Sequence, residues 1–273
     1  MLGRNYNKLN LFQNNTSNPL FSLNYSVTVI CLCIRLWLWW VHSKLGITME
    51  TPSESTWKEF TFKFIELSDY QSVLTHLKNN FYIEEPVNKA CGFTPEREHD
   101  YNTRMTDMLN RYQKHLAVVP TNEPNWIIAV LITNFHDLKN PLPSFEPRSP
   151  ITTKFLHVLE QMESTFNIHE TYGISNFPEL AILSVEKEFR GKGLATELFR
   201  RTISQLFSEG FPLIYSEFSN PISRKVGKRL GFEEVRRFYF KDFTMPDGSQ
   251  VFKNEEEQDN FVNMTVLTKP KCE

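Results

Sequence analysis

The sequence is poor in cysteine and glycine, and it has no long uninterrupted apolar run. Two of its four cysteines, Cys31 and Cys33, lie in one apolar stretch, whereas Cys91 and Cys272 stand far apart. This spacing excludes a disulfide scaffold and gives no Cys/His zinc pattern. The seven histidines lack a ligand spacing such as HxxxH, so we expect no metal site. Free thiols indicate a reducing compartment, and we expect a cytoplasmic protein.

An excess of either charge is also missing. Lys and Arg total 30, Asp and Glu total 32, and the formal net charge is −2, so bulk attraction to nucleic acid is not expected. With 23% charged and 40% hydrophobic residues, the composition is that of a globular protein rather than a disordered or collagenous one. A chain of 273 residues has room for one large domain or two small ones.

The first 48 residues contain no acidic residue, although they contain four basic ones. Residues 27–41 read VTVICLCIRLWLWWV, an apolar stretch interrupted by Thr28 and Arg35. As a helix this stretch would span roughly 23 Å, which is less than a hydrocarbon core of about 30 Å. The central arginine would add about 3 kcal/mol to the cost of membrane insertion. The stretch is therefore a poor membrane span.

Three interpretations of residues 1–48 remain open. The segment is a marginal membrane anchor, an amphiphilic or disordered extension, or a stretch upstream of a working protein that begins at Met49. We favour the last two, because METPSESTWKEF, residues 49–60, opens like an ordinary soluble N-terminus. Membrane contact is then expected only through residues 27–41, and residues 49–273 form the working domain.

Hydrophobic periodicity predicts one mixed domain in residues 49–273. Strands are expected where apolar residues alternate, and helices where they recur three and four apart. We expect strands at 59–67, 116–119, 126–135, 179–185, 211–218, 234–243 and 261–268. We expect helices after Asp69 and at 95–115, 151–167, 193–208 and 223–230, with loops at 140–150 and 254–259. This order indicates a single α+β layered domain.

A basic turn with two glycines follows the expected strand at 179–185. It reads RGKGLA, from Arg190 to Ala195, and leads into a helix. Gly191 and Gly193 allow the backbone to approach a ligand closely, and a helix N-terminus offers unpaired amides that suit a pyrophosphate. Alone the turn is a weak signal, because basic surface turns before helices are common. It is neither the dinucleotide-binding GxGxxG pattern nor a nucleotide P-loop.

Together with a second motif, SNPISRKVGKRLGFEEV at residues 219–235, this turn resembles the GCN5-related N-acetyltransferases (GNAT). The resemblance implies a GNAT fold, with a mixed and mostly antiparallel sheet that is splayed at the acetyl-CoA site and flanked by helices. It implies that acetyl-CoA lies against Asn220 and the turn residues Arg190, Gly191, Lys192, Gly193, Leu194 and Ala195. We expect the thioester carbonyl to meet backbone N–H groups at the strand end, at Leu183, Ser184 and Val185.

A finer resemblance is to the insect-type arylalkylamine N-acetyltransferases. NNFYIEEPVN, residues 79–88, matches a segment of that family and implies Glu85 as general base, while Ser219 and Ser223 match two serines implicated there. Many other acetyltransferases place a tyrosine acid where this chain has Gly227, which cannot donate a proton. From residue types alone, Glu84-Glu85 is a solvated acidic pair and Ser223 is a helix N-cap.

The sequence therefore predicts an acetyl-CoA-dependent N-acetyltransferase that transfers the acetyl group directly to a small primary amine, first of all an arylalkylamine. A polyamine or a protein amino group is the alternative acceptor. From other classes of function, a non-catalytic CoA-binding regulatory module and a membrane-tethered interaction protein built around residues 27–41 remain open. No nucleic acid partner is expected, and the oligomeric state is not indicated.

Overall fold

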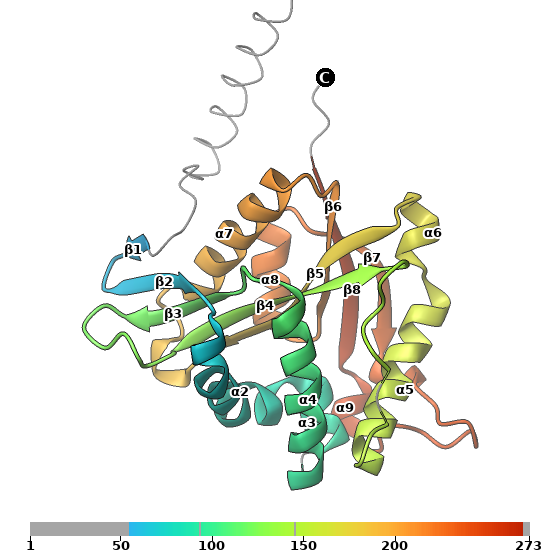
Figure 1. Ribbon diagram of the computed structural model, residues 1–273. Coiled ribbons are helices and arrows are strands. Elements are labelled where there is room, and N and C mark those ends of the chain that lie inside the picture. The colour runs from blue at the N-terminus through green and yellow to red at the C-terminus, as the bar shows by residue number, and fades with distance from the viewer. Residues whose placement is uncertain (1–54, 93, 145, 270–273) are drawn as a thin grey trace, which may run out of the picture. The chain divides into compact units, whose positions relative to one another are not determined.

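The structure is a computed structural model that describes residues 55–269, apart from residues 93 and 145 (Figure 1). The predictions for residues 1–48 lie outside these residues. In the described part no helix has both the length and the apolar character of a membrane span. The strands are β1 (Ser55–Trp57), β2 (Phe60–Phe64), β3 (Leu116–Pro120), β4 (Ala129–Asp137), β5 (Asn176–Val185), β6 (Leu213–Phe218), β7 (Glu233–Tyr239) and β8 (Phe261–Thr268).

Helices of very different length connect these strands. They are α2 (Tyr70–Glu84), α3 (Pro86–Cys91), α4 (Pro95–Arg111), α5 (Pro150–Thr165), α6 (Ile168–Tyr172), α7 (Leu194–Ser208), α8 (Pro221–Arg229) and α9 (Glu255–Gln258). Three short 3-10 turns accompany them, η2 (Leu67–Asp69), η3 (Lys187–Phe189) and η4 (Phe240–Asp242).

The described strands form one sheet in the order β1-β2-β3-β4-β5-β6-β8-β7. Every neighbouring pair is antiparallel except β5 and β6. The parallel pair has a single register position, Glu179 opposite Tyr215, so the two strands separate toward their carboxyl ends. The expected mixed, mostly antiparallel and splayed sheet is confirmed.

Helices cover both faces of this sheet (Figure 1). Successive residues of a strand point to opposite faces. Along β3, Val118 packs into a core with Leu198 and Phe199 of α7. Its neighbour Val119 packs into a second core with residues of α2 and α4, such as Leu77. The α/β/α layering that the sequence predicts follows from this alternation.

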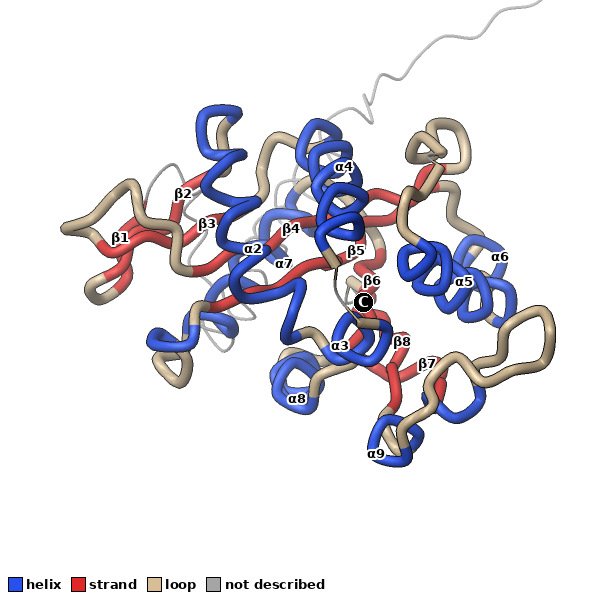
Figure 2. The backbone as a smooth tube through the Cα atoms, turned by 90° about the horizontal axis from the view of Figure 1, so that it is seen from below, coloured by secondary structure: helices blue, strands red, loops and turns tan. Residues whose placement is uncertain are grey.

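A third core belongs to the half of the sheet formed by β6, β7 and β8. Val158 and Met162 of α5 pack there with Met264 of β8, and Val87 of α3 joins them. Figure 2 shows α5 and α6 on this side of the molecule, whereas α2 lies over β2 to β4. The two groups of helices therefore flank the place where β5 and β6 part.

Several elements differ from the sequence-based expectation. The sequence analysis assigned no helix to the segment around residues 85–91, but Pro86–Cys91 form α3, and α2 continues to Glu84. The structure also has β1, α6 and, within the expected acidic loop, α9. Helix α8 begins at Pro221 rather than at Ser223, because the side chain of Asn220 caps it by accepting a hydrogen bond from Ile222 N at 2.8 Å.

Candidate active site

The separation of β5 and β6 opens into a cavity of about 990 Å³. Residues from nearly every predicted site segment line it: Glu85, Leu183, Ser184, Val185, Arg190, Gly191, Gly193, Leu194, Ala195, Ser219, Asn220 and Ser223. Segments more than one hundred positions apart in the sequence thus line the same cavity. Lys192 is the predicted site residue that does not line it.

The glycine turn has the backbone that a closely approaching ligand requires. Gly191 has φ of 79° and Gly193 has φ of 93°, a region that side chains with a Cβ atom avoid. Gly193 is the N-cap of α7 and has no side chain to bind the first-turn amides. Among the described side chains, none accepts from the amides of Leu194, Ala195 and Thr196, which lie at the positive end of a helix of 15 residues.

The two basic side chains of the turn point in different directions. Arg190 lines the cavity, donates from Nε to the Val185 carbonyl at 2.9 Å and forms an ion pair with Glu84. The Lys192 ammonium lies instead over the ring of Phe189, 4.9 Å from its centroid, and 3.9 Å from Glu59 Oε1. Of the two basic residues, only Arg190 lines the cavity.

The end of β5 offers two backbone amides to the opening. Glu186 N donates to the Ile128 carbonyl of the β4 side at 2.8 Å, so the preceding peptide groups alternate between β4 and the opening. The amides of Leu183 and Val185 consequently face the opening. The Val185 carbonyl, which accepts from Arg190 on that side, has the same orientation. These amides are the donors that a thioester carbonyl needs.

The hydroxyl of Ser184 has a partner that the sequence did not suggest. His76 of α2 is 5% exposed, and its Nε2 lies 3.0 Å from Ser184 Oγ. Burial lowers the pKa of His76 to about 4, so the imidazole is neutral near pH 7. The pair fixes the β5 end against α2. A lone histidine in an apolar helical stripe carries no sequence signal for this contact.

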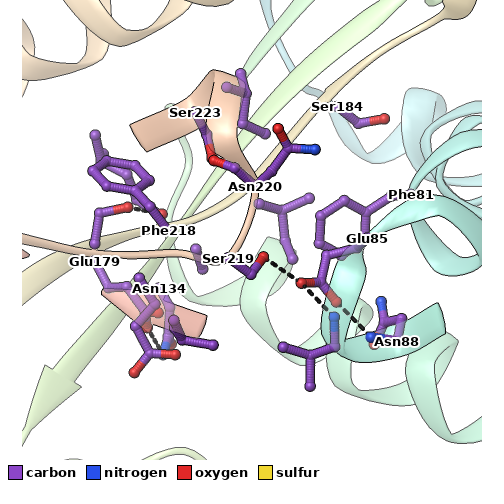
Figure 3. A pocket seen from close by; sticks show the side chains of 18 of the residues that line it. Phe81, Glu85, Asn88, Asn134, Glu179, Ser184, Phe218, Ser219, Asn220 and Ser223 are labelled. Carbon is purple, nitrogen blue, oxygen red and sulfur yellow. Dashed lines mark hydrogen bonds between the residues drawn. The ribbon is translucent and has the colours of Figure 1, made fainter. Parts of the chain in front are cut away.

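Glu85 begins α3 and is its N-cap. Its Oε1 accepts from Val87 N at 3.1 Å and its Oε2 from Asn88 N at 2.7 Å. Ser219 Oγ donates to Oε1 at 2.5 Å, as Figure 3 shows. Two bonds occupy Oε1, whereas Oε2 accepts one and keeps a lone pair for a further donor. This carboxylate is thus a built part of the site rather than half of a solvated acidic pair.

Burial raises the pKa of Glu85 above its usual value. The hydrogen bonds from Ser219, Asn88 and Val87 act in the opposite direction, because they favour the ionised form. The net shift is upward, so Glu85 is a stronger base than a solvated carboxylate.

Ser223 and Asn220 lie in the first turn of α8. Ser223 Oγ donates to the Asn220 carbonyl at 2.8 Å, and Asn220 Oδ1 is used for the helix cap. The N-cap role that propensity gave to Ser223 therefore belongs to Asn220. What these residues still offer the cavity are the amide Nδ2 of Asn220 and the acceptor lone pairs of Ser223.

Gly227 has a steric reason to be glycine. A Cβ atom there would lie 2.3 Å from Cε2 of Phe218, a ring that is 3% exposed in the core beneath α8. No tyrosine side chain fits at this position. The absence of a tyrosine acid, expected from the sequence, is thus built into the packing of α8 on β6.

The far end of the cavity carries an acidic cluster that the sequence analysis missed, consisting of Glu163 of α5, Glu179 of β5 and Glu217 of β6. Glu179 accepts from His136 Nε2 at 2.7 Å and from Asn134 Nδ2 at 3.1 Å. Tyr215 donates its hydroxyl to Glu217 at 2.6 Å. These residues are spread over four elements and show no sequence motif.

The carboxyl groups of the acidic cluster differ in charge. Burial and then the charge of Glu179 raise the pKa of Glu217 to about 8. Burial also raises the pKa of Glu179, but the hydrogen bond and charge of His136 outweigh it and the net pKa is lowered. Burial lowers the pKa of His136, but the hydrogen bond and charge of Glu179 outweigh it and its net pKa is raised. Glu179 and His136 thus favour each other's charged forms, beside a Glu217 whose protonated form is favoured.

Comparisons with known proteins agree with this architecture. The FR47-like protein family matches residues 172–241, the stretch from the end of α6 to η4. A candidate arylalkylamine N-acetyltransferase 7 of the yellow fever mosquito Aedes aegypti has a TM-score of 0.69 at 20% identity, over 81% of this chain and 98% of the other.

Two further solved structures are similar over most of their length. Arylalkylamine N-acetyltransferase 2 of Aedes aegypti has a TM-score of 0.63 at 20% identity, over 77% of this chain and 98% of the other. A polyamine N-acetyltransferase of Drosophila melanogaster, which forms N-acetylagmatine, has a TM-score of 0.66 at 17% identity, over 77% of this chain and 100% of the other. Residues 55–269 therefore have the fold of the GCN5-related N-acetyltransferases, as the sequence motifs predicted.

Proposed function

We propose that this chain is an acetyl-CoA-dependent N-acetyltransferase that transfers the acetyl group directly to a small primary amine. The observation that carries the proposal is that one cavity joins the glycine turn at residues 190–195 to the carboxylate of Glu85. We assign the activity to the domain at residues 49–273.

The residues of the turn fit the diphosphate of coenzyme A. Gly191 and Gly193 have positive φ angles and no side chain to block the approach of a phosphate, and the amides that begin α7 follow directly. Arg190 adds a cation once it leaves Glu84. Acetyl-CoA supplies the thioester from which the acetyl group is transferred. The amides of Leu183 and Val185 would polarise its carbonyl.

Glu85 is the proposed base. A primary ammonium must lose a proton before its nitrogen attacks the carbonyl carbon, and Glu85 Oε2 has the free lone pair to accept that proton, directly or through water. The new C–N bond forms as the C–S bond breaks. Ser219 holds Oε1 in place. Ser223, in the first turn of α8, is the proposed donor to the leaving sulfur once its hydroxyl turns away from the Asn220 carbonyl.

An arylalkylamine is the first candidate acceptor. The cavity that holds Glu85 and the acidic cluster also has many apolar and aromatic lining residues, among them Phe81, Met105, Met108, Phe135, Phe155, Leu156, Leu159 and Met162. Such a lining binds a flat apolar ring while the ammonium points to Glu85. Two of the structures with this fold are named for arylalkylamines.

A second acceptor class is favoured by the acidic cluster. Glu163, Glu179 and Glu217 would attract the distal cation of a diamine or guanidinoamine whose first amine lies at Glu85. One structure with this fold forms N-acetylagmatine, the product of such a dication. A cation bound there would favour ionised Glu217, so its binding should tighten as the pH rises from 7 toward 8.

An amine panel with the full chain tests both candidates. Release of coenzyme A thiol would be measured with 2-phenylethylamine, a diamine, a guanidinoamine and a peptide with a free N-terminus. Glu217→Gln should raise KM for the dications several-fold and leave KM for 2-phenylethylamine within twofold. Acetyl-CoA binding without turnover of any amine would instead support a non-catalytic regulatory module and defeat the proposal.

A further inference from the structure

Arg97 is a fully buried arginine in the first turn of α4. It is 0% exposed and is the largest side chain among those that the structure buries completely. No carboxylate of the described side chains lies within 4.0 Å of it. A buried cation without an adjacent counter-ion is costly, so its contacts require a reason.

The guanidinium of Arg97 forms hydrogen bonds with the C-terminal end of α3. It donates to the carbonyls of Asn88 and Gly92, and to Asn88 Oδ1 at 3.1 Å. The Tyr101 hydroxyl accepts from it at 2.7 Å, and the ring of Phe155 lies 5.2 Å from it. The last carbonyls of a helix carry partial negative charge, and here a cation satisfies them.

The opposite end of the same helix carries Glu85. Helix α3 has six residues, and helices of this length are unstable on their own. Asn88 connects the two ends, since its amide donates to Glu85 Oε2 at 2.7 Å while its carbonyl and side chain accept from Arg97. Two hydrogen bonds through one residue therefore separate the cation from the carboxylate.

We propose that Arg97 is the positioning residue of Glu85: it fixes α3, aims the amides of Val87 and Asn88 at the carboxylate, and stabilises the ionised form that accepts a proton. This inference rests on the proposed function of Glu85 as base. It adds a residue on α4 that no motif indicates and that touches neither substrate.

The charged and titratable groups around Glu85 support this assignment. Arg97 and Tyr101 face it from α4, and Cys91 faces it from α3. Burial raises the pKa of Cys91 to about 11 and that of Tyr101 above its usual value, so both are neutral near pH 7. The positive charge of Arg97 opposes the rise in the pKa of Glu85 that burial causes.

Two variants of the full chain test the proposal. Arg97→Gln removes the charge. Asn88→Asp keeps the size and the acceptor oxygens of residue 88 but places a negative charge between Arg97 and Glu85. This second variant keeps the proposal testable if Arg97→Gln does not fold. In both variants, the acid limb of the plot of kcat/KM against pH should move to a higher pH by about one unit. The value of kcat/KM should fall roughly tenfold at pH values below the limb and less at pH values above it. Arg97→Lys should move the limb less.

A readout without turnover separates this inference from the proposed function. The pKa of Glu85, followed by the ¹³C NMR signal that disappears in Glu85→Gln, should rise in Arg97→Gln and Asn88→Asp. Arg111→Gln, the same change at the other end of α4, should leave it in place. An unchanged pKa and limb in both test variants would overturn the inference, whereas a wild type that binds acetyl-CoA but acetylates no amine would defeat only the proposed function.

A double variant distinguishes positioning from general stability. If Arg97 acts through Glu85, adding Arg97→Gln to the Glu85→Gln variant should lower its remaining acetylation rate less than twofold, because the carboxylate that Arg97 positions is already gone. If the losses multiply, Arg97 has a purely structural role and the proposal is wrong.

Discussion

Ser219 donates a hydrogen bond of 2.5 Å to Glu85 across a sequence separation of 134 residues. The bond joins the loop after β6 to the N-cap of α3, so the two halves of the molecule meet at one carboxylate (Figure 3). It also sets the acidity of that carboxylate, because the donor favours its ionised form.

Ser219→Ala should therefore raise the pKa of Glu85, which becomes a stronger base but ionises only at a higher pH. Loss of this hydrogen bond raises the pKa of Glu85, and the acid limb of kcat/KM should move upward by about one pH unit. Initial rates from pH 5.5 to 10 would measure it. Ser223→Ala, whose hydroxyl bonds to a backbone carbonyl, should leave the limb where it is. An acid limb of Ser219→Ala at the same pH as that of the wild type would show that Ser219 does not act on Glu85.

Glu85→Gln should slow acetyl transfer by about 10²- to 10⁴-fold at pH 7. The loss should shrink toward pH 10, where a growing fraction of the amine is already neutral and needs no base. Glu84→Gln is the matched control, since Glu84 pairs with Arg190 and has no contact with the acceptor nitrogen in the mechanism. An equal loss at every pH would indicate that Glu85 binds or supports the fold instead.

Arg190→Ala should weaken coenzyme A binding by about tenfold, whereas Lys192→Ala should change it less than twofold. The reason is placement, because Arg190 lines the cavity, whereas Lys192 does not line it and its ammonium lies over the ring of Phe189. One phosphate contact to arginine is worth roughly 1.5 kcal/mol or more. Isothermal titration of both variants with coenzyme A measures the difference, and equal effects would contradict the placement of Lys192.

Gly227→Ala should destabilise the domain by about 1–3 kcal/mol, since the added methyl would overlap the ring of Phe218. Chemical denaturation would give the free energy of unfolding. Phe218→Leu introduced together with Gly227→Ala should recover part of the loss by vacating the space. If Gly227→Ala alone unfolds like the wild type, the contact between α8 and β6 is looser than the structure describes.

Glu217→Gln should stabilise the protein more at pH 8 than at pH 5. The folded-state pKa of Glu217 is about 8, above the usual 4.5, so in the wild type stability is lost as the pH rises between these values. Glutamine removes this loss and retains an acceptor for Tyr215. Melting temperatures at both pH values measure the effect. Glu160→Gln, an exposed site whose side chain is 77% accessible, is the control and should show no such divergence.

Much of the fold was predictable because periodicity and motifs are local. The alternation of Phe60 and Phe62 identified β2, and the stretch after Val185 identified the turn before α7. A further local rule for helix starts, which the predictions did not apply, would have located more of the helices. Four helices begin with a capping residue followed by proline, at Glu85-Pro86, Thr94-Pro95, Ser149-Pro150 and Asn220-Pro221. This pair both accepts an orphan amide and presets the first helical φ.

The remainder of the site depends on contacts between distant segments. Nothing local marks Glu179 and Glu217 as neighbours, since they meet only where β5 lies beside β6. His76 and Arg97 likewise gain their partners, Ser184 and the end of α3, from helix packing. Sequence patterns identify which residues can do chemistry, but burial and long-range pairing decide which of them do.

The single register position that joins β5 to β6 has a consequence for how this protein can change. The gap between β5 and β6 has the form of a wedge whose apex is the pair Glu179 and Tyr215. The glycine turn lies beyond the open end of this wedge. In the proposed reaction, the acetyl donor would therefore contact the turn beyond the end of β5, whereas the acceptor would contact the paired part of β5 and β6. If the chain has the proposed function, substitutions near Glu179 and Tyr215 should change which amine is accepted without changing how coenzyme A is bound. The gap between β5 and β6 would then be a starting point for engineering new acetylation specificities.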